Sequence, residues 1–303
     1  DPFKANVSGD VITGRGAADM KGALAAMLIA TEMFQNKYQV FHGRLGFLIT
    51  SDEEAAAING TKKVMAWLNE QDEHFDYCVV GEPSSDQSLG DVIRVGRRGS
   101  LNGKLTIKGK QGHVAYPDKA SNPIHSCLTA LAELSAVTWD TGNTFFPPTS
   151  FQISNFQSGT GATNVIPGDA IIDFNFRYST ESTETSLMQR TEDILKHYHL
   201  EYALQWSLSG EPFLTQDGVL ITSTSAAVNK IKGYQPVLST GGGTSDGRFI
   251  APSGIEVVEI GLCNETIHQI NECTSLSDLR DLTLIYLDIM EGILLPDNSQ
   301  HVS

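Results

Sequence analysis

The chain has 303 residues, of which 40% are hydrophobic and 19% are charged, as is usual for a globular protein large enough for more than one domain. Acidic residues outnumber basic ones by 36 to 21, which argues against a nucleic-acid-binding surface, because phosphates require clustered Lys and Arg. The four cysteines have neither metal-knuckle nor redox-motif spacing, and no apolar run approaches the roughly 20 residues that span a bilayer. We therefore expect a cytoplasmic protein that binds neither nucleic acid nor membrane.

The first part of the chain shows apolar runs that alternate with helical patterns, which is typical of a doubly wound α/β sheet. A helix is predicted from Met20, with one face formed by Leu24, Met27, Leu28 and Phe34. A buried strand, a helix and a short strand are then predicted at residues 44–50, 61–70 and 77–80.

The pattern changes after residue 98. Polar and apolar residues alternate near 101–107 and 169–178, which indicates an antiparallel sheet with one solvent-facing side, and helices are predicted at 122–137 and 184–198. Beyond residue 212 the first pattern resumes, with helices at 218–232 and 276–294 and strands near 237 and at 255–260. The sequence thus predicts an α/β domain with a doubly wound mixed sheet, formed by residues 1–98 and 212–303, and an inserted α+β domain of residues 99–211.

Polar side chains with metal-binding potential follow the predicted strands of the first domain. They are Asp19, the acidic run Asp52 to Glu54, Glu82 and His268. In open α/β sheets ligands bind at the carboxyl ends of the strands, and carboxylates that converge there raise each other's pKa unless a cation neutralises them. A single His among carboxylates suits zinc or cobalt better than calcium.

Each of these residues also has a simpler interpretation. Asp19 could cap the following helix, the acidic run could be a solvated turn, Glu82 could end a strand, and His268 could be a surface residue. Only their joint placement favours a metal site. Two glycine-rich segments, GRGAAD and GGGT, lack the complete dinucleotide and phosphate-loop patterns, which argues against nucleotide binding.

An ordered series of motifs now carries a family resemblance. It comprises GRGAADMKG, TSDEE, VGEPS, VGRRGS, GHVAYP, TNVIPG, FNFRYS, GGGTSDGRF and TIHQINE. Across residues 1–295 the chain resembles the bacterial succinyl-diaminopimelate desuccinylases, which belong to a larger family of co-catalytic zinc peptidases and deacylases. The resemblance implies hydrolysis of the amide bond of N-succinyl-L,L-diaminopimelate to succinate and L,L-diaminopimelate, a step in lysine and cell-wall precursor biosynthesis. A related deacetylase or aminoacylase, or a non-catalytic metal-binding dimer, is the alternative.

The resemblance also implies a site with two zinc ions, for which cobalt could substitute. The carboxylate of Asp19 would bridge both ions, Glu54 and His268 would complete one site, and Glu82 would serve the other. Glu53 would be the general base. The spacing of Glu53 and Glu54 alone does not assign their roles, so the assignment comes from the family pattern.

The inserted domain is expected, on the same resemblance, to form a homodimer. His113 in GHVAYP would cross to the other subunit's active site and stabilise the oxyanion, and Tyr116 and Asn164 would also reach across. Without the resemblance, His113 reads as a turn residue at the end of a strand.

The family's carboxylate-binding arginines match Arg97 and Arg177 in this sequence. An Arg fork suits a carboxylate better than Lys does. Arg98 is the alternative to Arg97 as the inward residue. Further hydrogen bonds to the small-molecule substrate are expected from Ser100, Gly243 and Thr244.

The beginning of the chain departs from the family pattern. It has no initiator Met, and the family's His-x-Asp motif, which precedes GRGAADMKG and supplies another zinc ligand, has no counterpart. We therefore expect an N-terminally truncated fragment with one incomplete metal site. Such a fragment should show little hydrolysis and bind at most one zinc well, through Asp19, Glu54 and His268.

Overall fold

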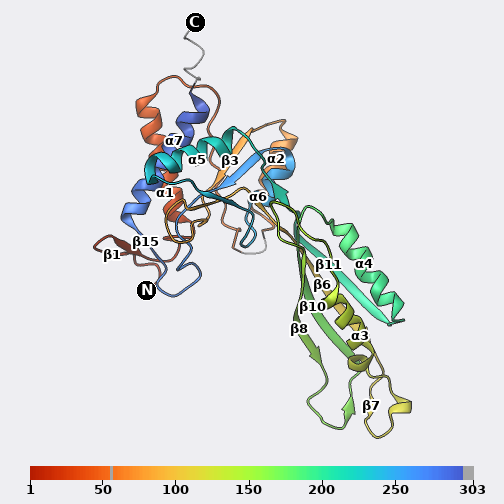
Figure 1. Cartoon of the computed structure of the whole chain (residues 1–303). Coiled ribbons are helices and arrows are strands. Elements are labelled where there is room, and N and C mark those ends of the chain that lie inside the picture. The colour runs from red at the N-terminus through yellow and green to blue at the C-terminus, as the bar shows by residue number, and fades with distance from the viewer. Residues whose placement is uncertain (55–56, 296–303) are drawn as a thin grey trace. The chain divides into compact units, whose positions relative to one another are not determined.

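The computed structural model describes residues 1–54 and 57–295. The chain divides into two compact units, one formed by residues 1–97 and 214–303 and the other by residues 98–213 (Figure 1). The short strands β5 (Gly96–Arg97) and β12 (Phe213–Leu214) lie at the two connections between the units. No helix in the described part of the chain is long and apolar enough to cross a membrane.

The first unit is built on a four-stranded mixed sheet with the order β13-β4-β14-β3. The strands are β3 (Tyr77–Val80), β4 (Val92–Arg94), β13 (Val237–Ser239) and β14 (Glu256–Glu259). Strand β14 is parallel to β3 and β13 is parallel to β4, whereas β14 and β4 are antiparallel. The predicted mixed α/β fold is therefore confirmed.

Three helices pack with this sheet in one apolar core. They are α1 (Lys21–Lys37), α5 (Val219–Lys232) and α7 (Leu276–Leu294), of which α1 and α7 run side by side (Figure 1). The buried face of α1 consists of Ala23, Ala26, Ala30 and Phe34. The predicted face was wrong at Leu28, whose side chain is 47% exposed. Small alanines face the core because they let neighbouring elements approach closely.

The strand predicted at residues 44–50 is also absent, although this segment is fully described. Its apolar side chains remain largely exposed, as Ile49 shows with 62% of its surface accessible. A strand is defined by backbone hydrogen bonds to a neighbour, and an apolar run does not supply these by itself.

The remaining elements of the first unit are short. Strands β1 (Asn6–Ser8), β2 (Val11–Thr13) and β15 (Cys273–Ser275) form a separate three-stranded antiparallel sheet with β2 in the centre. Helices α2 (Thr61–Glu70) and α6 (Gly247–Ile250) contact each other, and the one-turn helix η2 (Ala251–Ser253) follows α6.

The second unit is an antiparallel sheet with two helices along one face (Figure 1). Its strands are β6 (Gly99–Lys108), β8 (Ser150–Ser158), β10 (Asp169–Tyr178) and β11 (Tyr202–Gly210), in the order β11-β6-β10-β8. Its helices are α3 (Pro123–Ala136), which Asn122 caps through the amide of Ile124, and α4 (Glu184–His197), which begins with a capping box at Thr183.

Alternate residues of β10 enter the core beneath α3 and α4, including Phe174 and Phe176. The ring of Phe174 lies against Gly103 of β6, where a Cβ atom would come within 2.1 Å of it, so only glycine fits at this position. The intervening residues of β10 lie on the other face of the sheet. The short strands β7 (Gly112–His113) and β9 (Val165–Ile166) pair with each other, and the one-turn helix η1 (Pro117–Lys119) follows β7.

Candidate metal centre

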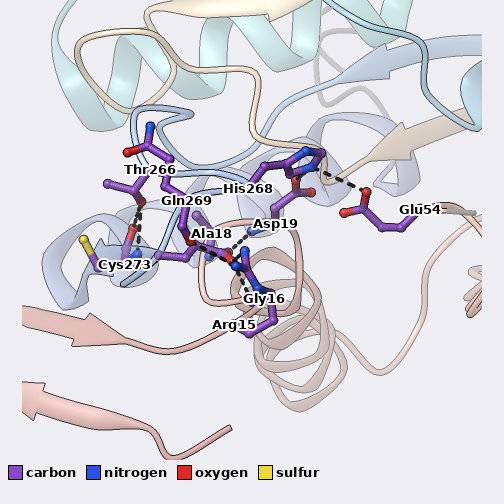
Figure 2. Close-up of polar contacts among 10 residues, drawn as sticks. Arg15, Gly16, Ala18, Asp19, Glu54, Thr266, His268, Gln269 and Cys273 are labelled. Atoms are coloured by element: carbon purple, nitrogen blue, oxygen red, sulfur yellow. Dashed lines mark hydrogen bonds and ion pairs between the residues drawn. The ribbon is translucent and has the colours of Figure 1, made fainter. Parts of the chain in front are cut away.

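Three side chains in the first unit converge in a way that could hold a metal ion. The Nε2 atom of His268 lies 3.1 Å from Asp19 Oδ2 and 3.4 Å from Glu54 Oε2. One ligand atom from each residue lies within 4.8 Å of the others. Figure 2 shows the three side chains pointing toward one another from different segments. The side chain of Asp19 is only 10% exposed, whereas those of His268 and Glu54 are 67% and 60% exposed, so one side of the cluster is open to solvent.

Of the four predicted metal ligands, only His268 and Glu82 come from the carboxyl edge of the main sheet. His268 lies in the loop after β14, and Glu82 follows the parallel neighbour β3. Asp19, in contrast, lies in the turn between β2 of the small sheet and α1, and Glu54 follows the unpaired segment 44–50. Asp19 is not a helix cap, because α1 begins at Lys21 and its N-cap is Met20.

Two further carboxyl groups near the cluster have raised pKa values. Burial, followed by the charges of Asp246 and Glu54, raises the pKa of Glu53 to about 7. Burial, the charge of Glu53 and the charge of Asp19 raise the pKa of Glu82, and a hydrogen bond to Asp19 raises it further. Burial is the largest cause for both groups, and neighbouring carboxylates raise both pKa values further.

The residues present fit a cation. A divalent ion would reduce the repulsion between neighbouring carboxylates that contributes to these raised pKa values, and its donors would be one imidazole nitrogen and several carboxylate oxygens. Imidazole with carboxylate suits zinc and other transition metals better than calcium.

Arg97, a predicted substrate contact, is buried in an ion pair. Its guanidinium donates to both carboxylate oxygens of Glu259, with Nε at 3.1 and 2.9 Å, and its NH1 donates to the carbonyl oxygen of Gly241 at 2.9 Å. Ser245 Oγ also donates to Glu259, whose side chain is completely inaccessible. A substrate carboxylate would have to share this arginine with Glu259.

The loop that carries Gly243 and Thr244 contacts Arg97 of the same ion pair through Gly241 and Gly242. Gly242 has a φ of +90°, and a Cβ atom there would approach Arg97 NH1 to 2.5 Å. The position of a Cβ atom on Gly243 is open, with no heavy atom within 4 Å. The backbone at Gly243 is thus accessible to a ligand.

In the second unit, the structure brings Ser100 and Arg177 directly opposite each other on β6 and β10. Asn175 Nδ2 donates to Ser100 Oγ at 3.1 Å, which places these polar groups on the face of the sheet away from the apolar core. The alternative inward arginine, Arg98, has a buried Nε atom without a hydrogen-bond partner among the described residues.

His113, Tyr116 and Asn164 also lie together in the second unit. His113 pairs with Val165 across the β7–β9 ladder, and Val114 N donates to Asn164 O at 3.1 Å. The His113 and Tyr116 rings are 5.9 Å apart. The amide of Ala115 donates to His113 Nδ1 at 3.1 Å, so in the neutral imidazole the proton is on Nε2, which is then a donor.

In the first unit, two buried acids contact predicted site residues although the sequence assigned no role to either of them: Glu259 contacts Arg97, and Glu272 contacts the amide of Asp19. Glu259 could have been found, because a charge inside an apolar strand requires a buried partner. Glu272 belongs to the TIHQINE segment, but its polar neighbours in the sequence do not indicate that it is buried. Burial raises its pKa, but hydrogen bonds from the amides of Gly16, Asp19 and Ala18 outweigh that effect and lower it.

The comparisons with known proteins agree on the family. The sequence profile of peptidase family M20/M25/M40 matches residues 1–292, and the chain belongs to this family. The succinyl-diaminopimelate desuccinylase of Nitrosococcus oceani is 57% identical over 294 residues, which cover 97% of this chain and 78% of that protein. The enzyme of the same name from Hydrogenovibrio crunogenus is 54% identical, with coverage of 97% and 78%.

A solved structure shows the same fold. The aminopeptidase PepT from Bacillus cereus aligns with a TM-score of 0.77 over 95% of this chain and 76% of its own, at 24% identity. The likeness at this identity concerns the fold.

Proposed function

We propose that this protein hydrolyses the amide bond of N-succinyl-L,L-diaminopimelate, releasing succinate and L,L-diaminopimelate. The observation that carries the proposal is the convergence of Asp19, Glu54 and His268 beside Glu53, in a chain 57% identical to a succinyl-diaminopimelate desuccinylase. The proposed place of the reaction is the cytoplasm, in lysine and cell-wall precursor biosynthesis.

The proposed cofactor is a pair of zinc ions, with cobalt as a substitute. Asp19 would hold both ions, Glu54 and His268 would complete one site, and Glu82 would serve the other. The effect of Asp19 on Glu82 supports this division, because the charge of Asp19 is one of the causes that raise the pKa of Glu82. When bound, the metal lowers the pKa of a water molecule and polarises the amide carbonyl.

Glu53 supplies the proton transfers in this proposal. Its carboxylate accepts a proton from the attacking water and later returns it to the nitrogen of the leaving amine. The adjacent position of Glu54, whose oxygen contacts His268, supports the assignment of Glu54 as ligand and Glu53 as base.

Substrate recognition is assigned to cations and donors that match the carboxylates of the substrate. Arg177 and Ser100 face each other across β6 and β10 and would bind one carboxylate together. Arg97 would contribute through the part of its guanidinium that Glu259 leaves available, and the loop at Gly243 and Thr244 would add hydrogen bonds.

The second unit would mediate a homodimer. His113 would then act in the site of the other subunit, where its Nε2–H group would stabilise the oxyanion, and Tyr116 and Asn164 would accompany it. The Ala115 amide supports this role, because it leaves Nε2 as the donor of the neutral ring.

The experiment compares succinylated and acetylated substrates. The full-length protein, freed of metal with a chelator, is assayed on N-succinyl- and N-acetyl-diaminopimelate before and after zinc is restored. The proposal predicts zinc-dependent release of succinate and little release of acetate. Preferred hydrolysis of the acetylated substrate would identify a deacetylase, and zinc binding without hydrolysis of either would identify a metal-binding protein.

A further inference from the structure

The carboxylate of Glu272 is enclosed by donors from the turn that carries Asp19. Its Oε2 atom accepts from the amide of Gly16 at 2.9 Å and from Arg15 NH1 at 2.8 Å. Its Oε1 atom accepts from the amides of Ala18 and Asp19, both at 2.9 Å. The Glu272 side chain is 1% exposed. These donors surround the carboxylate of the protein itself in the way that backbone amides surround a bound anion.

The two loops joined by this contact are the ones that carry Asp19 and His268. Gly14 N donates to Glu272 O at 2.9 Å, which continues the pairing of β2 with β15 up to the turn. On the other side, Thr266 Oγ1 accepts from Cys273 N and donates to Cys273 O, both at 3.0 Å, and so closes the His268 loop (Figure 2).

We propose that Glu272 is a positioning residue for the metal centre, which holds the backbone of Asp19 in place so that its carboxylate meets His268 before any metal arrives. The proposal rests on the function proposed above, because it takes Asp19 as a metal ligand. Glu272 acts through the amides at Gly16, Ala18 and Asp19, with Arg15 as a fourth donor. It lies four residues after His268, so one loop supplies a ligand and also fixes the loop that supplies another.

Both oxygens of Glu272 are needed as acceptors. In a Glu272→Gln variant one oxygen is replaced by an NH₂ group, which would face two donors, either those of Gly16 and Arg15 or those of Ala18 and Asp19. One half of the turn therefore loses its partner while the volume of the side chain is kept. Glu265→Gln is the matched control, because it removes an exposed carboxylate from the same loop.

The first measurement is zinc affinity, titrated in competition with a chromophoric chelator. Glu272→Gln should bind zinc about 10- to 100-fold more weakly than the parent, as is typical when a group that orients a metal ligand is removed, and Glu265→Gln should bind normally. Affinity equal to that of the parent in folded Glu272→Gln would overturn the proposal. Absence of zinc binding in the parent would instead refute the metal site itself, which separates the two failures.

The second measurement starts from the metal-free parent. Amide hydrogen exchange of the metal-free parent should show slow exchange at Gly16, Ala18 and Asp19, because Glu272 already holds these groups. Fast exchange at these amides that becomes slow only with zinc would show that the metal positions the turn, and would overturn the proposal. In Glu272→Gln the increase in exchange should be confined to this turn, whereas a merely structural role would raise exchange across the unit.

Discussion

Arg97 and Glu259 form a buried ion pair in which the guanidinium donates to both oxygens of a carboxylate that solvent does not reach. The predicted role of Arg97 is to bind a substrate carboxylate, yet the structure shows that a carboxylate of the protein already occupies its fork. The arginine therefore has a structural role that substrate binding would have to share.

Substitution of Arg97 should consequently reduce stability even without substrate. Arg97→Met removes the cation and leaves Glu259 buried and unpaired, which should lower the free energy of unfolding by about 3–5 kcal/mol. In the double variant Arg97→Met/Glu259→Gln, the remaining amide is neutral and can still bond to Ser245, so much of this loss should be recovered. The free energies are measured by urea unfolding.

The control is an exposed ion pair in the same unit. Arg44 contacts Glu73 at 2.7 Å, with side chains 63% and 41% exposed, and Arg44→Met should cost about 0–1 kcal/mol. Equal unfolding midpoints for Arg97→Met and Arg44→Met would refute the structural role and leave Arg97 to substrate binding alone.

The α/β fold could be predicted because local periodicity reflects burial, but the predictions for residues 44–50 and for Leu28 were wrong. Residues 44–50 have the apolar run of a strand but pair with no strand in the described part of the chain, and such pairing depends on distant residues. Leu28 is apolar and exposed, because the close-packed face of α1 is made of alanines such as Ala26. In both cases the side chains are apolar, as the prediction assumed, but burial and strand pairing depend on which distant residues lie beside them.

In the candidate site, too, some residues could be predicted from the sequence and others could not. Asp19, the acidic run Asp52 to Glu54, and His268 could be grouped from sequence, and the choice of Glu54 as the ligand came from the family resemblance. The expected common sheet edge was wrong, because Asp19 reaches the site from a different sheet and the segment before Glu54 forms no strand. Glu272 could not be found this way, because three of its four donors are backbone amides, which every residue type except proline provides. A lone glutamate in a polar loop has the same sequence pattern as a solvated one.

The assignment of Glu53 and Glu54 can be tested by two matched variants of the full-length protein. Glu53→Gln should lower turnover by at least about 10²-fold, because it removes the proposed base, and should retain zinc. Glu54→Gln should weaken zinc binding. Turnover of N-succinyl-diaminopimelate and zinc content by atomic absorption are measured on the same samples. Loss of zinc in Glu53→Gln with retention in Glu54→Gln would show that the two roles are exchanged.

Asp140 should make the second unit sensitive to acid. Burial raises its pKa, but hydrogen bonds from Ser182, Thr149 and Gly142 outweigh this and lower the pKa from 3.8 to about 2. Because the pKa is lower in the folded state, the contribution to stability is complete above about pH 4 and is lost as the pH falls toward 2. At about 1.36 kcal/mol for each pKa unit the shift corresponds to at most roughly 2 kcal/mol, and screening by solvent at this partly exposed carboxylate reduces the contribution to about 1 kcal/mol.

The measurement for Asp140 is unfolding at several pH values, followed by tryptophan fluorescence, to which the buried Trp139 beside Asp140 contributes. The difference in unfolding free energy between the parent and Asp140→Asn should shrink as the pH falls from 5 to 2. Asp118→Asn, which changes an exposed carboxylate in the same unit, should show a constant small difference. A difference for Asp140→Asn that does not vary with pH would contradict the prediction.

His113 can be tested for action between subunits. His113→Gln should lower kcat by about 10²- to 10³-fold, as loss of an oxyanion donor does, and leave zinc affinity unchanged. His125→Gln, at an exposed position on α3, is the matched control and should keep full activity.

Mixing His113→Gln with Glu53→Gln subunits then distinguishes action of His113 in the other subunit's site from action in its own. If His113 acts in the other subunit's site, each mixed dimer contains one site with both groups intact, and activity should return toward a quarter of the parent value. If His113 acts within its own subunit, every site lacks one group and the mixture should stay as inactive as its components.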